Sequence, residues 1–281
     1  MEVQVNNIQQ QQKESWNKFS PGWKKWDGLV MDFLHPMGEE TIRSLNLKET
    51  DTVLDVASGT GEPGLTISSV VSEGKVVLTD LSEGMLSVAR NKALRNNILN
   101  CEFHNCGACE LPFANAVFDA VSCRLGFMFV PDMHKAAKEM ARVLKPGGRV
   151  SITVWGAPEK NFWVTCIMDA IKKHLPVAPP PPGAPGMFRC ADSLHMTNLL
   201  KQAGFKNIEQ TEINGLVDYG SCDTYWENMN DVGAAVVMAL SRAGSETRSK
   251  IKQTLYELIH QKCQNGKVRL EYCAVHFSGE K

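Results

Sequence analysis

The chain of 281 residues contains no apolar run close to the roughly 20 residues that a membrane-spanning helix needs. Its first residues, MEVQVNNIQQQQKE, also lack the apolar centre of a secretory signal, and we expect this polar opening to be frayed or loosely helical. The formal charge of −1 leaves no basic surplus of the kind that binds nucleic acid. We therefore expect a cytoplasmic protein, a monomer or a homodimer, with a small-molecule partner, no nucleic-acid partner and no membrane span.

The cysteines give little support for disulfides or for a metal site. They number nine and are scattered along a long chain, which favours reduced thiols. Cys106 and Cys109 form a CxxC pair, but no second CxxC or paired histidines complete a set of four ligands. We predict no metal. The pair is expected to be two buried thiols, and a redox-sensitive disulfide stays open as the alternative.

Apolar, strand-like runs alternate with helical patterns over the middle of the chain. The expected strands cover 53–56, 75–80, 101–104, 118–123 and 149–155, with helices beginning near Gly64, Ser82 and Asp132. Beyond them we expect helices over 162–175, 193–203 and 251–259 and strands over 208–213 and 271–279. This order predicts an α/β fold with a doubly wound parallel sheet.

A glycine-rich turn follows the first strand in the segment VLDVASGTGEPGL at 53–65. Small residues there let bare backbone approach a ligand. Asp80 ends the second strand 21 residues after Gly59, where an acidic side chain can accept hydrogen bonds from ribose hydroxyls. The alternative for Asp80 is a helix-capping aspartate. NAD and S-adenosylmethionine both fit, because the GTGEPG match to G-x-G-x-x-G is weak by itself.

Four segments, taken in order along the chain, resemble a known family, and this resemblance decides between NAD and S-adenosylmethionine. VLDVASGTGEPGL, VLTDLSEGML, ELPFANAVFDAVSCRLGFMF and EMARVLKPGGRVSITVW resemble the class I S-adenosylmethionine-dependent methyltransferases, particularly the small-molecule branch of ubiquinone and menaquinone biosynthesis. The resemblance covers roughly 50–155, and 186–205 resembles a later segment of that branch. It implies S-adenosyl-L-methionine as cofactor and a Rossmann-like seven-stranded sheet with an antiparallel last strand, which EYCAVHFSG would supply.

The same resemblance divides the chain into four parts. Residues 1–47 would form an N-terminal helical lid and 48–155 the S-adenosylmethionine-binding core. Residues 156–205, with the proline-rich loop VAPPPPGAPG, would be a substrate-side insertion, and 206–281 would complete the sheet.

The resemblance also assigns the family's cofactor contacts to matching positions of this sequence. The methionine part of the cofactor would be lined by Asp55, Ala57, Ser58, Gly59, Thr60 and Gly61, the ribose diol by Asp80, the adenine by Leu81 and Met85, and the carboxylate side by Arg124 and Leu125. Asp55 would also shape the loop. For Met85 the alternative is ordinary helix core, and for Arg124 a surface ion pair.

One position departs from the family pattern. Gly107 stands where many members have an aspartate that accepts from the adenine amine. The adenine edge would then rely on the backbone of Gly107 and Ala108, or on Cys106 and Cys109.

Aromatic residues are concentrated near the N-terminus, as Trp16, Phe19, Trp23 and Trp26. The resemblance predicts a lid over cofactor and substrate, in which Trp23 and Trp26 contact the cofactor; the alternative is a hydrophobic staple onto the sheet. An apolar acceptor pocket is predicted from Phe127, Met128, Phe129, Trp155, Phe162, Trp163 and Phe188, several of which core packing explains equally well.

The resulting hypothesis is a metal-independent methyltransferase that transfers a methyl group to a small-molecule acceptor by in-line displacement. The fourth strand ends in Cys123 and Arg124, so the metal site of catechol-type O-methyltransferases lacks its first ligand. His134 and His195 are candidates for a general base, although each also fits a solvent-facing histidine on a helix. A nicotinamide-dependent oxidoreductase and a non-catalytic S-adenosylmethionine-binding protein are the alternatives.

Overall fold

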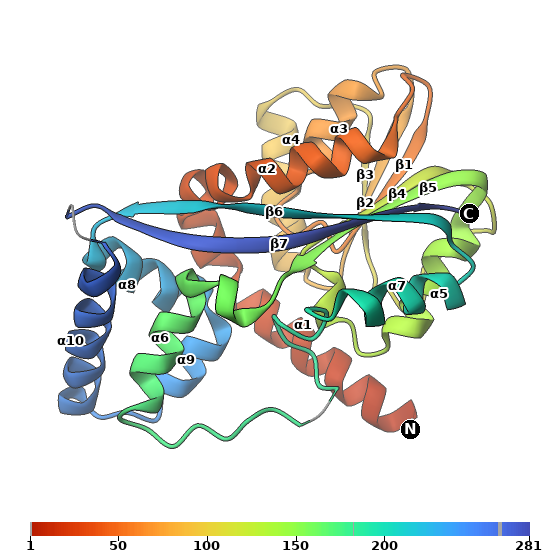
Figure 1. Cartoon of the computed structure of the whole chain (residues 1–281). Coiled ribbons are helices and arrows are strands. Elements are labelled where there is room, and N and C mark those ends of the chain that lie inside the picture. The colour runs from red at the N-terminus through yellow and green to blue at the C-terminus, as the bar shows by residue number, and fades with distance from the viewer. Residues whose placement is uncertain (1, 182, 264–265) are drawn as a thin grey trace.

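The computed structural model describes residues 2–181, 183–263 and 266–281, built around a seven-stranded sheet (Figure 1). The strands lie in the order β3-β2-β1-β4-β5-β7-β6. Strands β1 to β5 pair in parallel, and β7 runs antiparallel to both of its neighbours, which confirms the predicted sheet. The strands are β1 (Thr52–Val56), β2 (Lys75–Asp80), β3 (Cys101–Asn105), β4 (Phe118–Arg124), β5 (Leu144–Trp155), β6 (Lys206–Gly220) and β7 (Val268–Glu280).

Helices cover the sheet and extend beyond it on one side (Figure 1). Within the described residues, no helix is long and apolar enough to cross a membrane. The helices are α1 (Glu2–Lys25), α2 (Asp27–Leu45), α3 (Gly64–Val70), α4 (Glu83–Arg95), α5 (Met133–Val143), α6 (Phe162–Lys172), α7 (Ser193–Gln202), α8 (Cys222–Val232), α9 (Ala234–Leu240) and α10 (Ser245–Lys262), with short 3-10 turns η1 (Phe127–Phe129) and η2 (Pro158–Lys160).

Successive residues of the central strands bury in two different clusters. Val53 and Val76 pack with residues of α3 and α4 in one cluster, whereas Leu54 and Val77 pack with residues of α5 and α7 in the other. All four are at most 3% exposed. Because neighbouring strand residues point to opposite faces, helices must cover both sides of this sheet.

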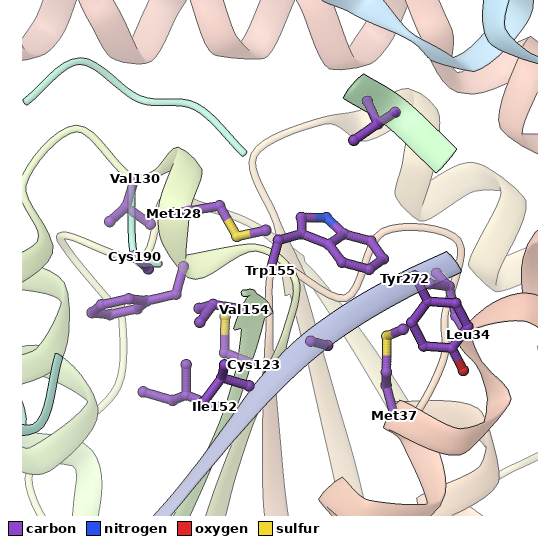
Figure 2. Close-up of a cluster of buried hydrophobic side chains, with 14 of the residues drawn as sticks. Leu34, Met37, Cys123, Met128, Val130, Ile152, Val154, Trp155, Cys190 and Tyr272 are labelled. Carbon is purple, nitrogen blue, oxygen red and sulfur yellow. The ribbon is translucent and has the colours of Figure 1, made fainter. Parts of the chain in front are cut away.

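The larger cluster continues to the carboxyl ends of β4 and β5. Figure 2 shows Cys123, Ile152 and Val154 of these strands close to Met128 and Trp155. Met128 was predicted to line a pocket, but it is fully buried and belongs to the core. Buried apolar side chains therefore pack closely at the ends of these two strands.

Strands β6 and β7 are longer than predicted. They pair from Lys206 with Glu280 to Gly220 with Val268, and Figure 1 shows them extending past the other strands toward α8 and α10. β6 lies at the edge of the sheet, and most of its residues are exposed or half-buried. Its sequence therefore shows little of the apolar alternation from which a strand is predicted. The stretch 206–281 also contains α8, α9 and α10 between these two strands.

The polar N-terminal segment, expected to be frayed or loosely helical, forms the helix α1 from Glu2 to Lys25. The Asn17 Oδ1 atom accepts hydrogen bonds from the Ser82 hydroxyl at 2.7 Å and the Gly84 amide at 3.0 Å, at the start of α4. Lys25 pairs with Asp231 of α8 at 2.7 Å. Tertiary contacts of this kind stabilise helices that a polar sequence alone would leave marginal.

Candidate functional site

The loop between β1 and α3 lies against the sheet in a left-handed conformation. Ala57, Gly59 and Gly61 have φ values of 55°, 55° and 112°. The Ser58 amide donates to the Thr79 carbonyl at 2.9 Å, which anchors the loop to the end of β2. A Cβ atom on Gly59 would meet no atom within 4 Å, so this glycine faces open space. The loop therefore leaves its backbone accessible to a ligand.

Asp80 joins this loop to the start of α4. Its Oδ2 atom accepts from the Gly59 amide at 2.9 Å, and its Oδ1 atom accepts from the Ser82 amide at 2.8 Å. Burial raises the pKa of Asp80 to about 6, although these two backbone donors favour the ionised form. Each carboxylate oxygen has a further lone pair, so Asp80 can still accept a hydrogen bond from a ligand hydroxyl.

Asp55 lies beneath the loop. It is fully buried, with the Ser122 hydroxyl donating to Oδ1 at 2.6 Å and the Gly64 amide donating to Oδ2 at 3.1 Å. Burial raises its pKa to about 7. These contacts fix the start of α3 relative to β1 and β4, which is the loop-shaping position that we expected.

Arg124 is half-buried at the end of β4 and bonds to backbone carbonyls, and it forms no ion pair with any described residue, so its interpretation as a surface ion pair is wrong. Its guanidinium donates to the Leu34 carbonyl at 3.1 Å and to the Glu62 carbonyl at 2.8 Å. Burial lowers its pKa, against the attraction of the nearby Asp55 and Glu62 carboxylates. The side chain thus holds α2 beside the glycine-rich loop.

A cavity of about 1280 Å³ extends from this loop to the helices beside the sheet. Its far wall is mostly apolar and comes from α6, residues 176–181 and 185–188, α8 and α9, including Met168, Met229 and Val236. The near wall collects most of the predicted cofactor residues: Ala57, Ser58, Gly59, Thr60, Asp80, Leu81, Met85, Gly107, Ala108, Cys109, Arg124, Leu125 and Trp23. Of the predicted acceptor-pocket residues, it brings together Phe129, Trp155, Trp163 and Phe188.

Three predicted cofactor residues do not line this cavity. Asp55 lies beneath the loop. Gly61 faces α3, where an added Cβ would approach Leu65 Cδ1 to 2.6 Å. Trp26 turns toward α8, and its indole nitrogen donates to Asp231 Oδ2 at 2.8 Å.

The predicted general bases lie elsewhere. His134 on α5 and His195 on α7 are exposed, and no histidine is among the described residues that line the cavity. The cavity does contain Asp169, whose carboxylate lies 3.7 Å from the Lys172 amine on the same helix. Over the described ranges, no group of three or more His, Cys, Asp or Glu side chains could hold a metal ion.

Helix α1 covers part of the cavity. The Trp16 ring lies 5.2 Å from that of Phe129 and 6.1 Å from that of Trp23. At Gly107 an added Cβ would lie 2.8 Å from the Gln9 side-chain nitrogen, so α1 reaches the segment after β3. The aromatic density pointed to this helix, but no sequence signal identified its polar lining residues, which are Gln9, Gln12 and Ser15.

The Cys106 and Cys109 thiols lie in the segment that lacks the expected carboxylate. Both are free and line the cavity. The Cys109 thiol donates to the Asp132 carbonyl at 3.3 Å. Burial raises the pKa of Cys106 to about 11 and also raises that of Cys109, so both thiols stay protonated and weakly reactive near neutral pH.

Comparison with known proteins links this geometry to one family. The model of the ubiE/COQ5 methyltransferase family matches residues 29–178. The demethylmenaquinone methyltransferase of Listeria monocytogenes is 31% identical over 164 residues, which cover 58% of this chain and 69% of that protein. The ubiquinone/menaquinone biosynthesis C-methyltransferase UbiE of a Marinomonas species is 39% identical over 124 residues, or 43% of this chain and 49% of that protein.

Among solved structures, the YcgJ protein of Bacillus subtilis has the same fold. It superposes with a TM-score of 0.61 over 88% of this chain and 98% of its own length. At 20% sequence identity, this similarity concerns the fold alone. Helix α1 and everything from α7 onward lie outside the stretch that matches the family.

Proposed function

The chain belongs to the ubiE/COQ5 methyltransferase family and is an enzyme that uses S-adenosyl-L-methionine as methyl donor, and from this premise we propose that it methylates a small, largely apolar molecule. The observation that carries the proposal is the cavity of about 1280 Å³, which joins the glycine-rich loop to an apolar wall. Pockets for one small ligand are typically about 300–1,000 Å³, so this cavity can hold donor and acceptor together. The family decides against the oxidoreductase and the non-catalytic alternatives.

The loop residues fit the cofactor in two independent ways. The space that a Cβ on Gly59 would fill is open. The Ser58 hydroxyl is buried in the cavity wall and has no hydrogen-bond partner among the described residues. We propose that Ser58 and Arg124 bind the amino-acid end of the cofactor and that Asp80 accepts from its ribose hydroxyls.

The adenine edge needs a substitute for the missing aspartate. Gln9 of α1 supports one, because its side-chain amide reaches the backbone position of Gly107. An amide can both donate and accept, as the adenine amine and ring nitrogens require. In this proposal the lid supplies the polar group that the loop after β3 lacks.

When bound, the cofactor supplies a methyl group on a sulfonium sulfur, which is electrophilic without further activation. The chain's own residues then have to hold the acceptor in line with that methyl group and exclude water. Trp16 and Trp23 of α1 line the cavity, and aromatic faces attract a nearby cation. The metal-independent part of the proposal depends on the end of β4, where Cys123 and Arg124 stand in place of a carboxylate ligand.

Calorimetry and a methyl-transfer assay test the proposal. S-Adenosylhomocysteine should bind the protein and NADH should not. Transfer of a labelled methyl group should then be detected with members of a panel of apolar quinols, phenols, amines and thiols, and it should persist in EDTA. Binding of S-adenosylhomocysteine without transfer to any apolar acceptor, but with transfer to charged ones, would overturn the acceptor class.

A further inference from the structure

Besides the Ser58 hydroxyl, two buried side-chain N–H donors in the cavity wall have no partner among the residues described. They are the indole Nε1 of Trp23 on α1 and the side-chain Nδ2 of Asn228 on α8. Asn228 is only 2% exposed. Unpaired donors in a buried wall cost free energy, and most buried polar atoms in folded proteins are paired. A ligand in the cavity can supply the missing partner.

The two donors lie on different helices, α1 and α8, which contact each other directly. A Cβ on Gly22 of α1 would lie 2.1 Å from the Asp231 carbonyl oxygen of α8, so only glycine allows this approach. The Trp26 indole also donates to the Asp231 carboxylate. Trp23 follows Gly22 in the chain, and Asn228 lies about one helical turn before Asp231. Their unpaired groups therefore flank one helix contact.

The surroundings of Asn228 indicate what kind of ligand group would bind. Its neighbours in the cavity wall, Met229, Val232 and Val236, are apolar. The Trp23 indole N–H can only donate, so the ligand must bring an acceptor atom. Two neutral donors beside apolar side chains suit an uncharged oxygen, because neither donor supplies the opposite charge that a desolvated carboxylate needs.

Resting on the proposed function, we propose that Trp23 and Asn228 are positioning residues that donate hydrogen bonds to a carbonyl oxygen of the apolar methyl acceptor. Because one donor lies on α1 and the other on α8, the bound oxygen also links the covering helix to the far wall of the cavity. Neither residue lies in the 29–178 stretch that matches the family, so this selection belongs to the chain's additional helices.

A pair of probes that differ only at the carbonyl tests this. Binding of 2-acetylnaphthalene and 2-ethylnaphthalene is measured by calorimetry on the full chain saturated with S-adenosylhomocysteine. The ketone should bind the unaltered protein about tenfold more tightly, the effect expected of one or two neutral hydrogen bonds. Trp23→Phe and Asn228→Leu should each reduce this preference to about threefold or less while retaining affinity for the hydrocarbon.

Matched variants control for the loss of an asparagine or an indole. Asn230→Ala alters the same helix, but the Asn230 amide donates to the Trp226 carbonyl at 2.8 Å and does not line the cavity. Trp226→Phe removes an indole outside the lining. Both should keep the full ketone preference. If Asn228→Leu does not fold, Asn228→Ala and Trp23→Phe still measure the same preference.

Hydrogen exchange gives a second readout that is independent of turnover. With the ketone bound, amides of α1 should exchange more slowly in the unaltered protein than in Trp23→Phe. Equal affinity for the two probes, or a preference that survives in both variants, would overturn the inference even where S-adenosylhomocysteine binds. Failure of the unaltered protein to bind S-adenosylhomocysteine at all would instead overturn the proposed function.

Discussion

Replacing Asp80 with alanine should weaken binding of S-adenosylhomocysteine by about 10- to 150-fold. A hydrogen bond from a ligand hydroxyl to a charged acceptor contributes about 1.5–3 kcal/mol, and each 1.4 kcal/mol is about a factor of ten in affinity. The structure adds a second effect in the same direction. Asp80 accepts from the Gly59 amide at 2.9 Å, so its loss also removes a bond that holds the glycine-rich loop in place.

Asp80→Ala should also lower the free energy of unfolding by about 1–3 kcal/mol, because the Gly59 and Ser82 amides lose their acceptor. Asp192→Ala is the matched control. Asp192 likewise accepts from two backbone amides, those of Leu194 and His195 at the start of α7, but it does not line the cavity. The control should lose about 0.5–2 kcal/mol of stability, typical of a helix cap, with unchanged affinity.

Titration calorimetry and urea unfolding of both variants separate the two effects. We expect a large loss of affinity in Asp80→Ala alone and a loss of stability in both. An Asp80→Ala protein that binds S-adenosylhomocysteine as tightly as the unaltered chain would refute the ribose assignment. A similar loss of affinity in Asp192→Ala would show that the measurement reports general destabilisation.

Three further changes test other parts of the molecule. Gly59→Val should lose S-adenosylhomocysteine binding in calorimetry, because its side chain enters open cavity space and the φ of 55° strains a β-branched residue; normal binding contradicts the loop assignment. A chain that starts at Gly28 should fold yet lose most turnover, since α1 no longer covers the cavity; full activity would rule out the lid. Burial lowers the pKa of His276 from 6.5 to about 4, so the native state binds fewer protons than the unfolded chain between these values. The contribution of His276 to the free energy of unfolding should therefore fall as pH drops from about 6.5 to 4, so the stability of the unaltered chain relative to that of His276→Gln should decrease over this range; a difference in urea unfolding that does not change with pH would contradict this.

The sequence by itself determined the part of the site that is local in the chain. A buried strand, a turn of small residues and an aspartate at the end of the next strand are neighbours in any parallel α/β sheet, because adjacent strands end at the same edge. The sequence pattern therefore places Gly59 beside Asp80, and a hydrogen bond joins the two residues. The antiparallel last strand followed from the family resemblance, since its own apolar pattern fixes a strand but no direction.

Only the tertiary structure decided which faces of the helices meet the cavity. Trp23 and Trp26 are one turn apart on or beside α1, yet Trp23 lines the cavity while Trp26 bonds to Asp231. That outcome depends on the rotation of α1 against α8, which is set by close packing at Gly22 and not by any local pattern.

Long-range packing also explains why the predicted general bases lie away from the cavity and why the sequence did not identify Asn228 as a hydrogen-bond donor in its wall. His134 lies on an outer, exposed face of its helix, whereas Asn228, a residue type usually found at surfaces, is buried in the wall. Burial of a polar side chain depends on which segments, distant in the sequence, pack around it. Local propensity and spacing therefore determined the glycine-rich loop, and long-range packing of α1, α6, α8 and α9 decided the shape of the cavity.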